Sequence, residues 1–176
     1  MAHVVFLRAA NVGGNNVFRP AQFVRGLSHL DVVNIGAAGT FVVRAKATSA
    51  EIRREIVERL PFETAVVIRP GKEILELVRS DPFRTVKFSK DLRGWVGALA
   101  GIPTLKAKLP ITMPPTEPWG VRFDRVSGAF AFGLWQRLPK GFYIPANVIE
   151  KTIGVSTTVR WWETIEKIAK VLTADG

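Results

Sequence analysis

Residues 4–16 of the chain read Val4-Val5-Phe6-Leu7-Arg8-Ala9-Ala10-Asn11-Val12-Gly13-Gly14-Asn15-Asn16. The apolar start is too short for a helix and is typical of a buried strand. A diglycine flanked by asparagines follows, and Pro20 stands where a helix can begin, because the first turn of a helix does not need its missing N–H. A strand, a glycine-rich loop and a helix in this order can turn backbone N–H groups toward an anion. The same order also opens many α/β domains that bind nothing there.

The segments that follow predict a small sheet with two helices. A helix is expected over residues 20–30, a hairpin over 31–43, and a strand over 64–69. Thr48-Ser49-Ala50-Glu51 has the spacing of a capping box, which opens a helix that Pro61 ends. This βαββαβ order is the ferredoxin-like pattern. The hairpin argues against a doubly wound parallel sheet, which places a helix between successive strands.

The chain therefore predicts an α+β fold with two subdomains. Residues 1–84 form the ferredoxin-like subdomain, which a third helix over 72–80 completes. Residues 85–176 form a second, smaller α+β subdomain with closing helices at the C-terminal end. Five prolines between residues 102 and 119 predict a long irregular connection.

Within the second subdomain the local patterns predict six elements. We expect a strand over 86–89, a helix over 92–99 that Gly94 and Gly97 loosen, strands over 121–126 and 129–135 that form a hairpin, and helices over 145–153 and 159–172.

The composition is that of a folded, basic domain. Hydrophobic residues make up 47% and charged residues 23% of the 176 positions, which is typical of globular proteins. The 25 Lys and Arg exceed the 15 Asp and Glu by a net charge of +10. Such a charge favours polyanionic partners such as nucleic acid or nucleotides, and it equally serves solubility. There is no cysteine, which excludes disulfides and fits a reducing compartment. We therefore expect a cytoplasmic protein without a signal or membrane segment.

Two segments together resemble a known family. Leu7-Arg8-Ala9-Ala10-Asn11-Val12-Gly13-Gly14 resembles the Leu-Arg-Gly-Ile-Asn-Val-Gly-Gly start of the domain-of-unknown-function 1697 family, and residues 153–164 resemble its Leu-Gly, then Thr-x-Arg-Asn-Trp-x-Thr signature. The family's Ser-Gly-Asn turn is Ala37-Ala38-Gly39-Thr40 here, and its Asn after the arginine is Trp161. The resemblance implies a bacterial-type cytoplasmic protein with ferredoxin-like subdomains and implies no known activity.

The loop after the first strand is the first candidate binding site. Arginine offers a fixed fork of donors to phosphate or carboxylate, and glycines let a ligand approach the backbone closely. The spacing fits neither a Walker loop nor the dinucleotide fingerprint. The alternative is a tight connection in which glycines supply positive φ and asparagine side chains hold the turn. The ligand-binding residues predicted here are Arg8, Asn11, Gly13, Gly14 and Asn15.

The start of the last expected helix is the second candidate. There Thr158 is predicted as the helix cap, and Arg160 and Thr164 share a face at i,i+4. A cation near a helix N-terminus is unfavourable, so Arg160 requires an anionic partner. That partner is either a ligand or, as the favoured structural alternative, a group of this same chain.

Other chemistry finds little support in the residues. Neither histidine, His3 or His29, has a second His or a Cys nearby, so we expect no metal, and no cofactor motif is present. No serine stands in a known nucleophile motif, so no catalytic residue is assigned. Phe130 and Phe132 resemble the base-stacking strand of RNA-recognition domains in part, but two core phenylalanines explain them more simply.

We interpret the chain as a binding module for a phosphorylated small molecule or nucleic acid. The hypothesis requires Arg8 and Arg160 to converge on the diglycine loop. Two alternatives stay open: an enzyme that acts on a small anionic substrate at the same loop, and a module for protein interaction or for self-association, the latter giving a homo-oligomer.

Overall fold

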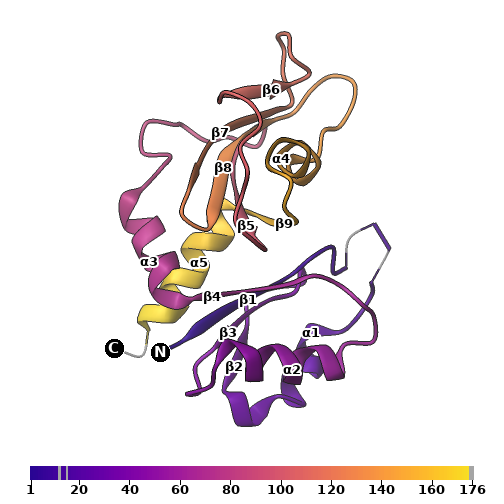
Figure 1. Cartoon of the computed structure of the whole chain (residues 1–176), viewed down its shortest axis with the longest axis vertical. Helices are drawn as coiled ribbons and strands as arrows, with labels where there is room; N and C mark the ends of the chain where they lie inside the picture. Colours follow the sequence, from indigo (N-terminus) through magenta and orange to yellow (C-terminus); the bar gives the residue numbers. More distant parts are fainter. Residues whose placement is uncertain (12, 15, 175–176) are drawn as a thin grey trace. The chain divides into compact units, whose positions relative to one another are not determined.

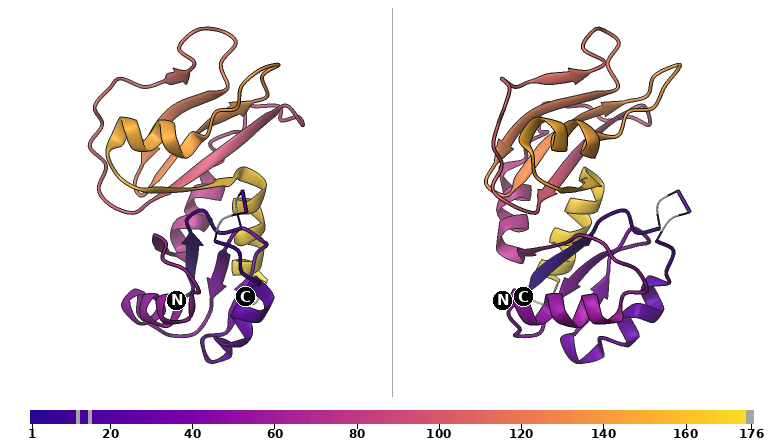
Figure 2. Two further views of the ribbon diagram at one scale, coloured as in Figure 1. Left: turned by 90° about the vertical axis from the view of Figure 1, so that its right-hand side faces the viewer. Right: turned by 45° about the vertical axis from the view of Figure 1, so that its right-hand side comes forward.

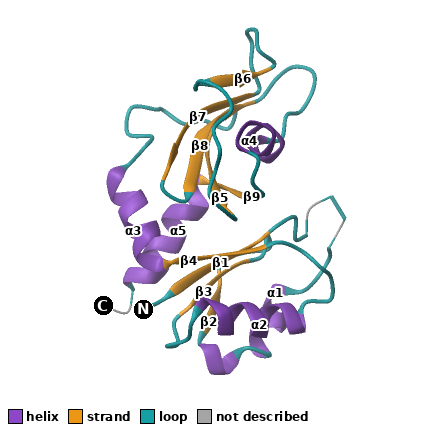
Figure 3. Cartoon of the chain, in the orientation of Figure 1, coloured by secondary structure: helices purple, strands orange, loops and turns teal. Residues whose placement is uncertain are grey.

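The computed structural model describes residues 1–11, 13–14 and 16–174. Within them the chain forms two antiparallel sheets and five α-helices, an α+β fold (Figure 1, Figure 3). The chain divides into two compact units. The first unit contains Met1–Pro82 and the segment from Thr164 onward, and the second contains Phe83–Glu163. The division into residues 1–84 and 85–176 as separate subdomains stays a prediction.

The first sheet holds the segment with which the sequence opens. Its strand order is β2-β3-β1-β4, and every neighbouring pair is antiparallel. The inner strand β1 is buried on both faces, which explains why its sequence is continuously apolar instead of alternating. The four strands are β1 (His3–Leu7), β2 (Val32–Asn34), β3 (Thr40–Val43) and β4 (Val66–Pro70).

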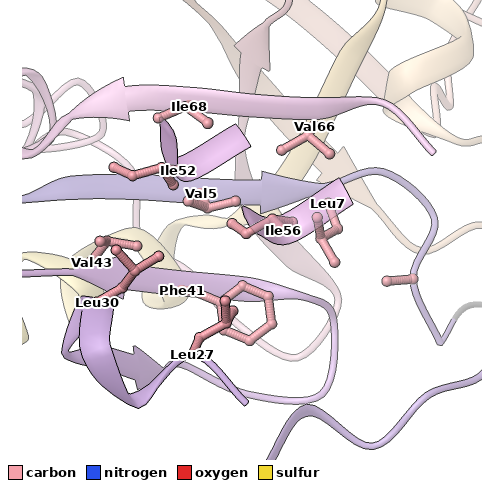
Figure 4. Close-up of a cluster of buried hydrophobic side chains, with 11 residues drawn as sticks. Val5, Leu7, Leu27, Leu30, Phe41, Val43, Ile52, Ile56, Val66 and Ile68 are labelled. Carbon is pink, nitrogen blue, oxygen red and sulfur yellow. The ribbon is translucent and has the colours of Figure 1, made fainter. Parts of the chain in front are cut away.

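Two helices cover one side of this sheet (Figure 1). They are α1 (Pro20–Arg25), which a 3-10 turn over Ser28–Leu30 continues, and α2 (Ser49–Arg59). Figure 4 shows the core between them, where Val5 and Phe41 from the sheet meet Ile52 of α2. Along the chain the elements follow in the order β1, α1, β2, β3, α2 and β4. The ferredoxin-like arrangement of these elements stays a prediction.

The capping box predicted at α2 is confirmed. The Thr48 hydroxyl accepts a hydrogen bond from the Glu51 N–H at 3.2 Å, and the Glu51 carboxylate accepts one from the Thr48 N–H at 2.7 Å. These bonds favour the charged carboxylate, so the pKa of Glu51 lies below its usual 4.5. Two N–H groups at the start of the helix are thereby satisfied.

Two further helices complete the first unit. Helix α3 (Gly71–Ser80) begins directly after β4, and α5 (Trp162–Thr173) ends the described chain. A Cβ at Gly71 would lie 2.8 Å from Leu172 Cδ2, so a larger residue at the start of α3 would displace the end of this leucine side chain in α5. Further along α5, Lys167 Nζ donates to the Ile35 carbonyl oxygen at 3.2 Å, beside the turn that follows β2.

The second unit is a five-stranded sheet with one helix on a face. Helix α4 (Pro145–Ile153) packs across it (Figure 2), and its Ile149 and Ile153 join Trp95 and Phe123 in the core. The strands, in spatial order, are β6 (Ile111–Met113), β7 (Val121–Ser127), β8 (Phe130–Gln136), β5 (Leu92–Leu99) and β9 (Thr157–Trp161).

The helix expected over residues 92–99 is wrong, because this segment is strand β5. It pairs with β8 on one side and β9 on the other, and it is buried on both faces, so it lacks the alternation that marks a half-buried strand. Its glycines make room for neighbours. A Cβ at Gly94 would lie 2.8 Å from the Phe88 ring, and one at Gly97 would lie 2.5 Å from Thr157 Cγ2.

Two more predicted elements differ from the structure. The strand expected over 86–89 is a loop with a single bridge between Ser89 and Leu92. The last helix begins at Trp162, because residues 157–161 pair with β5 as strand β9. The helices at α3 and α4 and the β7–β8 hairpin are confirmed.

The proline-rich segment over residues 102–119 is irregular, as predicted, apart from the short strand β6. Three of its prolines, Pro110, Pro114 and Pro118, follow cis peptide bonds. Among the described residues, no helix has the length and apolar character needed to cross a bilayer.

Candidate functional site

The loop after β1 is tied to the rest of the first unit through the backbone of Arg8. The Arg8 N–H donates to the Ala65 carbonyl at 3.0 Å, and the Arg8 carbonyl accepts from the Thr64 hydroxyl at 2.6 Å. Both partners precede β4, the neighbour of β1 in the sheet. The main chain at Arg8 is therefore fixed independently of its half-buried side chain.

Asn11 shapes the loop with its side chain. Its Nδ2 donates to the Ala37 carbonyl at 2.8 Å, and its Oδ1 accepts from the Phe18 N–H at 2.9 Å. Its own N–H donates to the Asn16 carbonyl at 3.2 Å, and its φ of 53° lies in the left-handed region that asparagine tolerates. The Asn11 side chain thus holds the turn, as the structural alternative expects, and its role as a ligand-binding residue stays a prediction.

The diglycine lies open at the far end of the loop. Gly13 and Gly14 are exposed, with φ values of +58° and +77°, and apart from their chain neighbours no described atom lies within 4 Å of a Cβ built on either residue. Side chains would be strained there, although the space for them exists. Asn15, the remaining predicted ligand in this loop, lies outside the described residues.

A second turn packs directly against this loop. The Leu7 N–H donates to the Gly39 carbonyl at 2.8 Å, and a Cβ at Gly39 would lie 2.9 Å from the Cβ atoms of Leu7 and Ala10. Gly39 also has a φ of +69°, so both its conformation and its surroundings favour glycine. The turn after β2 is thereby part of the candidate site. Sequence reasoning treated it only as a hairpin turn, although its likeness to the family's Ser-Gly-Asn turn marked its place.

The second group of predicted residues occupies different elements from those expected. Thr158 and Arg160 lie on strand β9, opposite Ala98 and Val96 of β5, so Thr158 is not a helix cap. Alternation along the strand places both side chains on one face. Thr164 lies in the first turn of α5, so the helical i,i+4 pairing of Arg160 with Thr164 is wrong. The error follows from reading residues 159–161 as helix.

Both β9 side chains are buried. The Arg160 side chain is nine-tenths buried, its Nη1 donates to the Val159 carbonyl at 2.8 Å, and burial lowers the pKa of its guanidinium to about 10. The guanidinium thus remains charged at neutral pH. Thr158 Oγ1 is buried as well, and among the described residues it has no hydrogen-bond partner.

The structure therefore groups the predicted residues in two sets. The loop after β1, in the first unit, holds Arg8, Asn11, Gly13 and Gly14. Thr164 belongs to the same unit but lies in helix α5. Thr158 and Arg160 share strand β9 in the second unit. The convergence of Arg8 with Arg160 stays a prediction.

Two other sequence interpretations can be compared with the structure. In the described part of the chain, no group of three or more His, Asp or Glu is placed to hold a metal ion. His29 instead contacts Glu55 at 3.0 Å. Phe130 and Phe132 are 5% and 3% exposed, so the core alternative is confirmed for them and the base-stacking interpretation is wrong.

Comparisons with known proteins agree with this fold. The structure of a protein described as a conserved bacterial protein of Streptococcus pneumoniae superimposes with a TM-score of 0.59 at 14% identity and covers 98% of each chain. No curated protein sequence matches the chain. The model of the family described as "Protein of unknown function (DUF1697)" matches residues 1–98, which is more than half of the chain. This protein is therefore a member of the DUF1697 family.

Proposed function

We propose that the chain is a binding module for a phosphorylated ligand, with the loop after β1 as its phosphate site. The observation that carries the proposal is the open diglycine. Gly13 and Gly14 leave the space around their backbone empty of other described atoms within 4 Å of each Cβ position. Neither glycine carries a side chain, so an anion can approach the main-chain N–H groups of these two residues closely.

Two residues of the loop, Arg8 and Asn11, are anchored to the rest of the unit before any ligand arrives. The Asn11 side chain bonds to Ala37 and Phe18, and the Arg8 backbone bonds to Thr64 and Ala65. Holding a loop in its bound conformation lowers the entropy that binding must remove. The guanidinium of Arg8 supplies the charge that a phosphate needs, in a fork that suits its oxygens.

Phosphate is the chemistry shared by a phosphorylated small molecule and a nucleic acid backbone, and the net charge of +10 favours both. The βαββαβ order and the strand order β2-β3-β1-β4 support a ferredoxin-like arrangement of the first unit as part of this proposal. A cytoplasmic location goes with it, since the chain has no cysteine.

Thermal-shift measurements with inorganic phosphate, pyrophosphate and nucleoside monophosphates test the proposal. A ligand at about 100 times its Kd stabilises the folded chain by roughly 2.7 kcal/mol. The Arg8→Gln variant removes the guanidinium and keeps both backbone bonds, so we expect it to fold and to lose the shift. Arg25→Gln, at an exposed position of α1, removes the same charge and should keep the shift.

The salt dependence separates a small ligand from a nucleic acid. If about four phosphates are neutralised, the affinity falls with a log–log slope near −3.6, which is on the order of 100-fold between 50 and 200 mM salt. Arg8→Gln and Arg25→Gln losing equal amounts of shift would contradict the proposal. If the wild type chemically converts the bound ligand and Arg8→Gln does not, the chain is instead an enzyme acting on a small anionic substrate.

A further inference from the structure

The second unit contains a pocket of about 530 Å³ between the end of β8 and the loop that leads to α4. Its volume lies in the range of small-molecule sites. Its lining includes Gly120, Trp135, Gln136, Arg137, Phe142 and Tyr143.

Three aromatic rings form its walls. Trp135 is nearly buried, and its ring centroid lies 6.0 Å from that of Phe142, with the rings tilted by 58°. Phe142 itself is 71% exposed. The Tyr143 ring lies against Gly120, where a Cβ would approach Tyr143 Cδ2 to 2.7 Å. The pocket therefore offers a partly packed aromatic floor and one aromatic ring whose surface is open to solvent.

The aromatic contacts continue along the same face of the sheet. The ring centroids of Trp135 and Trp161 lie 5.7 Å apart, and the Arg93 guanidinium stacks on Trp161 at 4.1 Å from the centroid of its ring. Arg93 also pairs with Glu163 at 3.3 Å. At one end of this series of contacts, the ring of Trp161 is already covered by Arg93. At the other end, the one ring contact that Phe142 makes within the described chain is the tilted contact with Trp135.

Two exposed cations belong to the loop that lines the pocket. Arg137 lines the pocket and is 65% exposed while it pairs with Asp91 at 2.8 Å. Lys140 is exposed in the loop between Pro139 and Gly141. The segment Phe83–Glu163 carries 12 Lys and Arg against 5 Asp and Glu, so this unit holds +7 of the chain's net charge of +10. A polyanion with aromatic groups can contact both the aromatic rings of the pocket and the positive charge of this unit, whereas an uncharged apolar ligand contacts only the rings.

We infer that this pocket binds an unpaired base of a single-stranded nucleic acid, which stacks on Phe142 while neighbouring phosphates lie against Arg137 and Lys140. Stacking on an aromatic side chain, combined with a positively charged path for the backbone, is how proteins hold single strands without reading their sequence. Gln136 lies at the pocket with its Nε2 bonded to the Trp119 carbonyl at 2.6 Å, which fixes the orientation of its amide toward one wall. The inference goes beyond the proposed function, because it concerns another unit and does not use the loop after β1.

An abasic oligomer separates base recognition from phosphate binding. We would compare octauridylate with an eight-unit abasic oligomer of the same phosphate count, and follow binding by tryptophan fluorescence, to which Trp135 contributes. The expected result is octauridylate binding about tenfold tighter than the abasic oligomer, within the range measured for one stacked base. Phe142→Ala should abolish most of that difference, and Phe142→Trp should retain it.

Ile144→Ala is the matched control, because Ile144 is 48% exposed, lies two positions away and does not line the pocket. Equal affinity for the two oligomers, or no binding of either, would overturn the inference. So would an acidic peptide of the same charge that binds as tightly as octauridylate, or a loss in Ile144→Ala as large as that in Phe142→Ala. The proposed phosphate site at Arg8 survives equal affinity for the two oligomers, since it requires no base, and the absence of any binding would leave it only a phosphorylated small molecule as ligand.

Discussion

The Asn11 side chain joins two loops of the first unit by donating from Nδ2 to the Ala37 carbonyl oxygen at 2.8 Å. Ala37 lies in the turn after β2, and Asn11 lies in the loop after β1, so one amide spans the two segments that form the candidate phosphate site. The same amide accepts the Phe18 N–H and thereby closes the loop on itself. The shape of the site therefore depends on a residue that need not touch the ligand.

Replacing Asn11 should destabilise the first unit, and two variants separate the reasons. Asn11→Ala loses both side-chain hydrogen bonds, at about 1 kcal/mol each. It also places alanine at a φ of 53°, which costs about 1–2 kcal/mol more. Asn11→Gly loses the same bonds without the backbone strain. Urea unfolding should therefore rank the stabilities as wild type, then Asn11→Gly, then Asn11→Ala, and equal values for the two variants would argue against a strained position.

Gly39→Ala should destabilise the chain more than Gly128→Ala. Both glycines have positive φ, +69° and +57°, so each alanine variant carries a strain of about 1–2 kcal/mol. At Gly39 the new Cβ meets the Cβ atoms of Leu7 and Ala10 at 2.9 Å, whereas at Gly128 no described atom other than those of its chain neighbours lies within 4 Å. Overpacking adds about 1–3 kcal/mol at Gly39. Thermal unfolding of the two variants measures the difference, and equal losses of stability would contradict this prediction.

His3 should give the stability a pH-dependent contribution in the mildly acidic range. Burial and, second, the N-terminal ammonium group lower the pKa of its imidazole below 6.5. The unfolded chain then binds more protons than the folded chain near and below pH 6.5. This contribution is present above that pH and is lost as the pH falls. An NMR titration should find the depressed pKa, and His3→Gln should remove this part of the acid sensitivity while leaving the rest.

How much the sequence can predict depends on which residues carry a local signal. The first unit has such signals: the apolar run before Arg8, the Thr48–Glu51 capping box and the glycine turn at 36–39 each fix one element through short-range chemistry. The second unit lacks them at β5. Gly94 and Gly97 are normally unfavourable inside a strand. They are required here because Phe88 and Thr157 fill the space where side chains would stand, and no local pattern reveals that.

The candidate site was predictable in part for the same reason. The loop from Arg8 to Gly14 is contiguous, so its residues had to lie together. The role of Ala37 and the Gly39 packing depend on a contact between two distant segments, which the sequence does not display. The assignment of Thr158 and Arg160 to a helix failed because Trp161 and Val159 contribute apolar positions that fit a helical period as well as an alternating strand.

Arg160 yields the last prediction, because its charge is held in a buried position. Burial lowers the pKa of its guanidinium to about 10, well below the value of an exposed arginine. Above about pH 10 the folded chain therefore releases this proton before the unfolded chain does, so the unfolded chain binds more protons at such pH values. Stability attributable to Arg160 consequently rises with pH there, at up to about 1.4 kcal/mol per pH unit. The contributions of all other groups are shared by two proteins that differ at one residue, so a difference between them isolates Arg160. Arg160→Met supplies that difference: the unfolding free energy of the wild type relative to Arg160→Met should be constant from about pH 7 to 9 and should shift in favour of the wild type by about 1 kcal/mol near pH 11. A relative stability that stays flat through pH 11 would mean that the guanidinium keeps an ordinary pKa despite its burial.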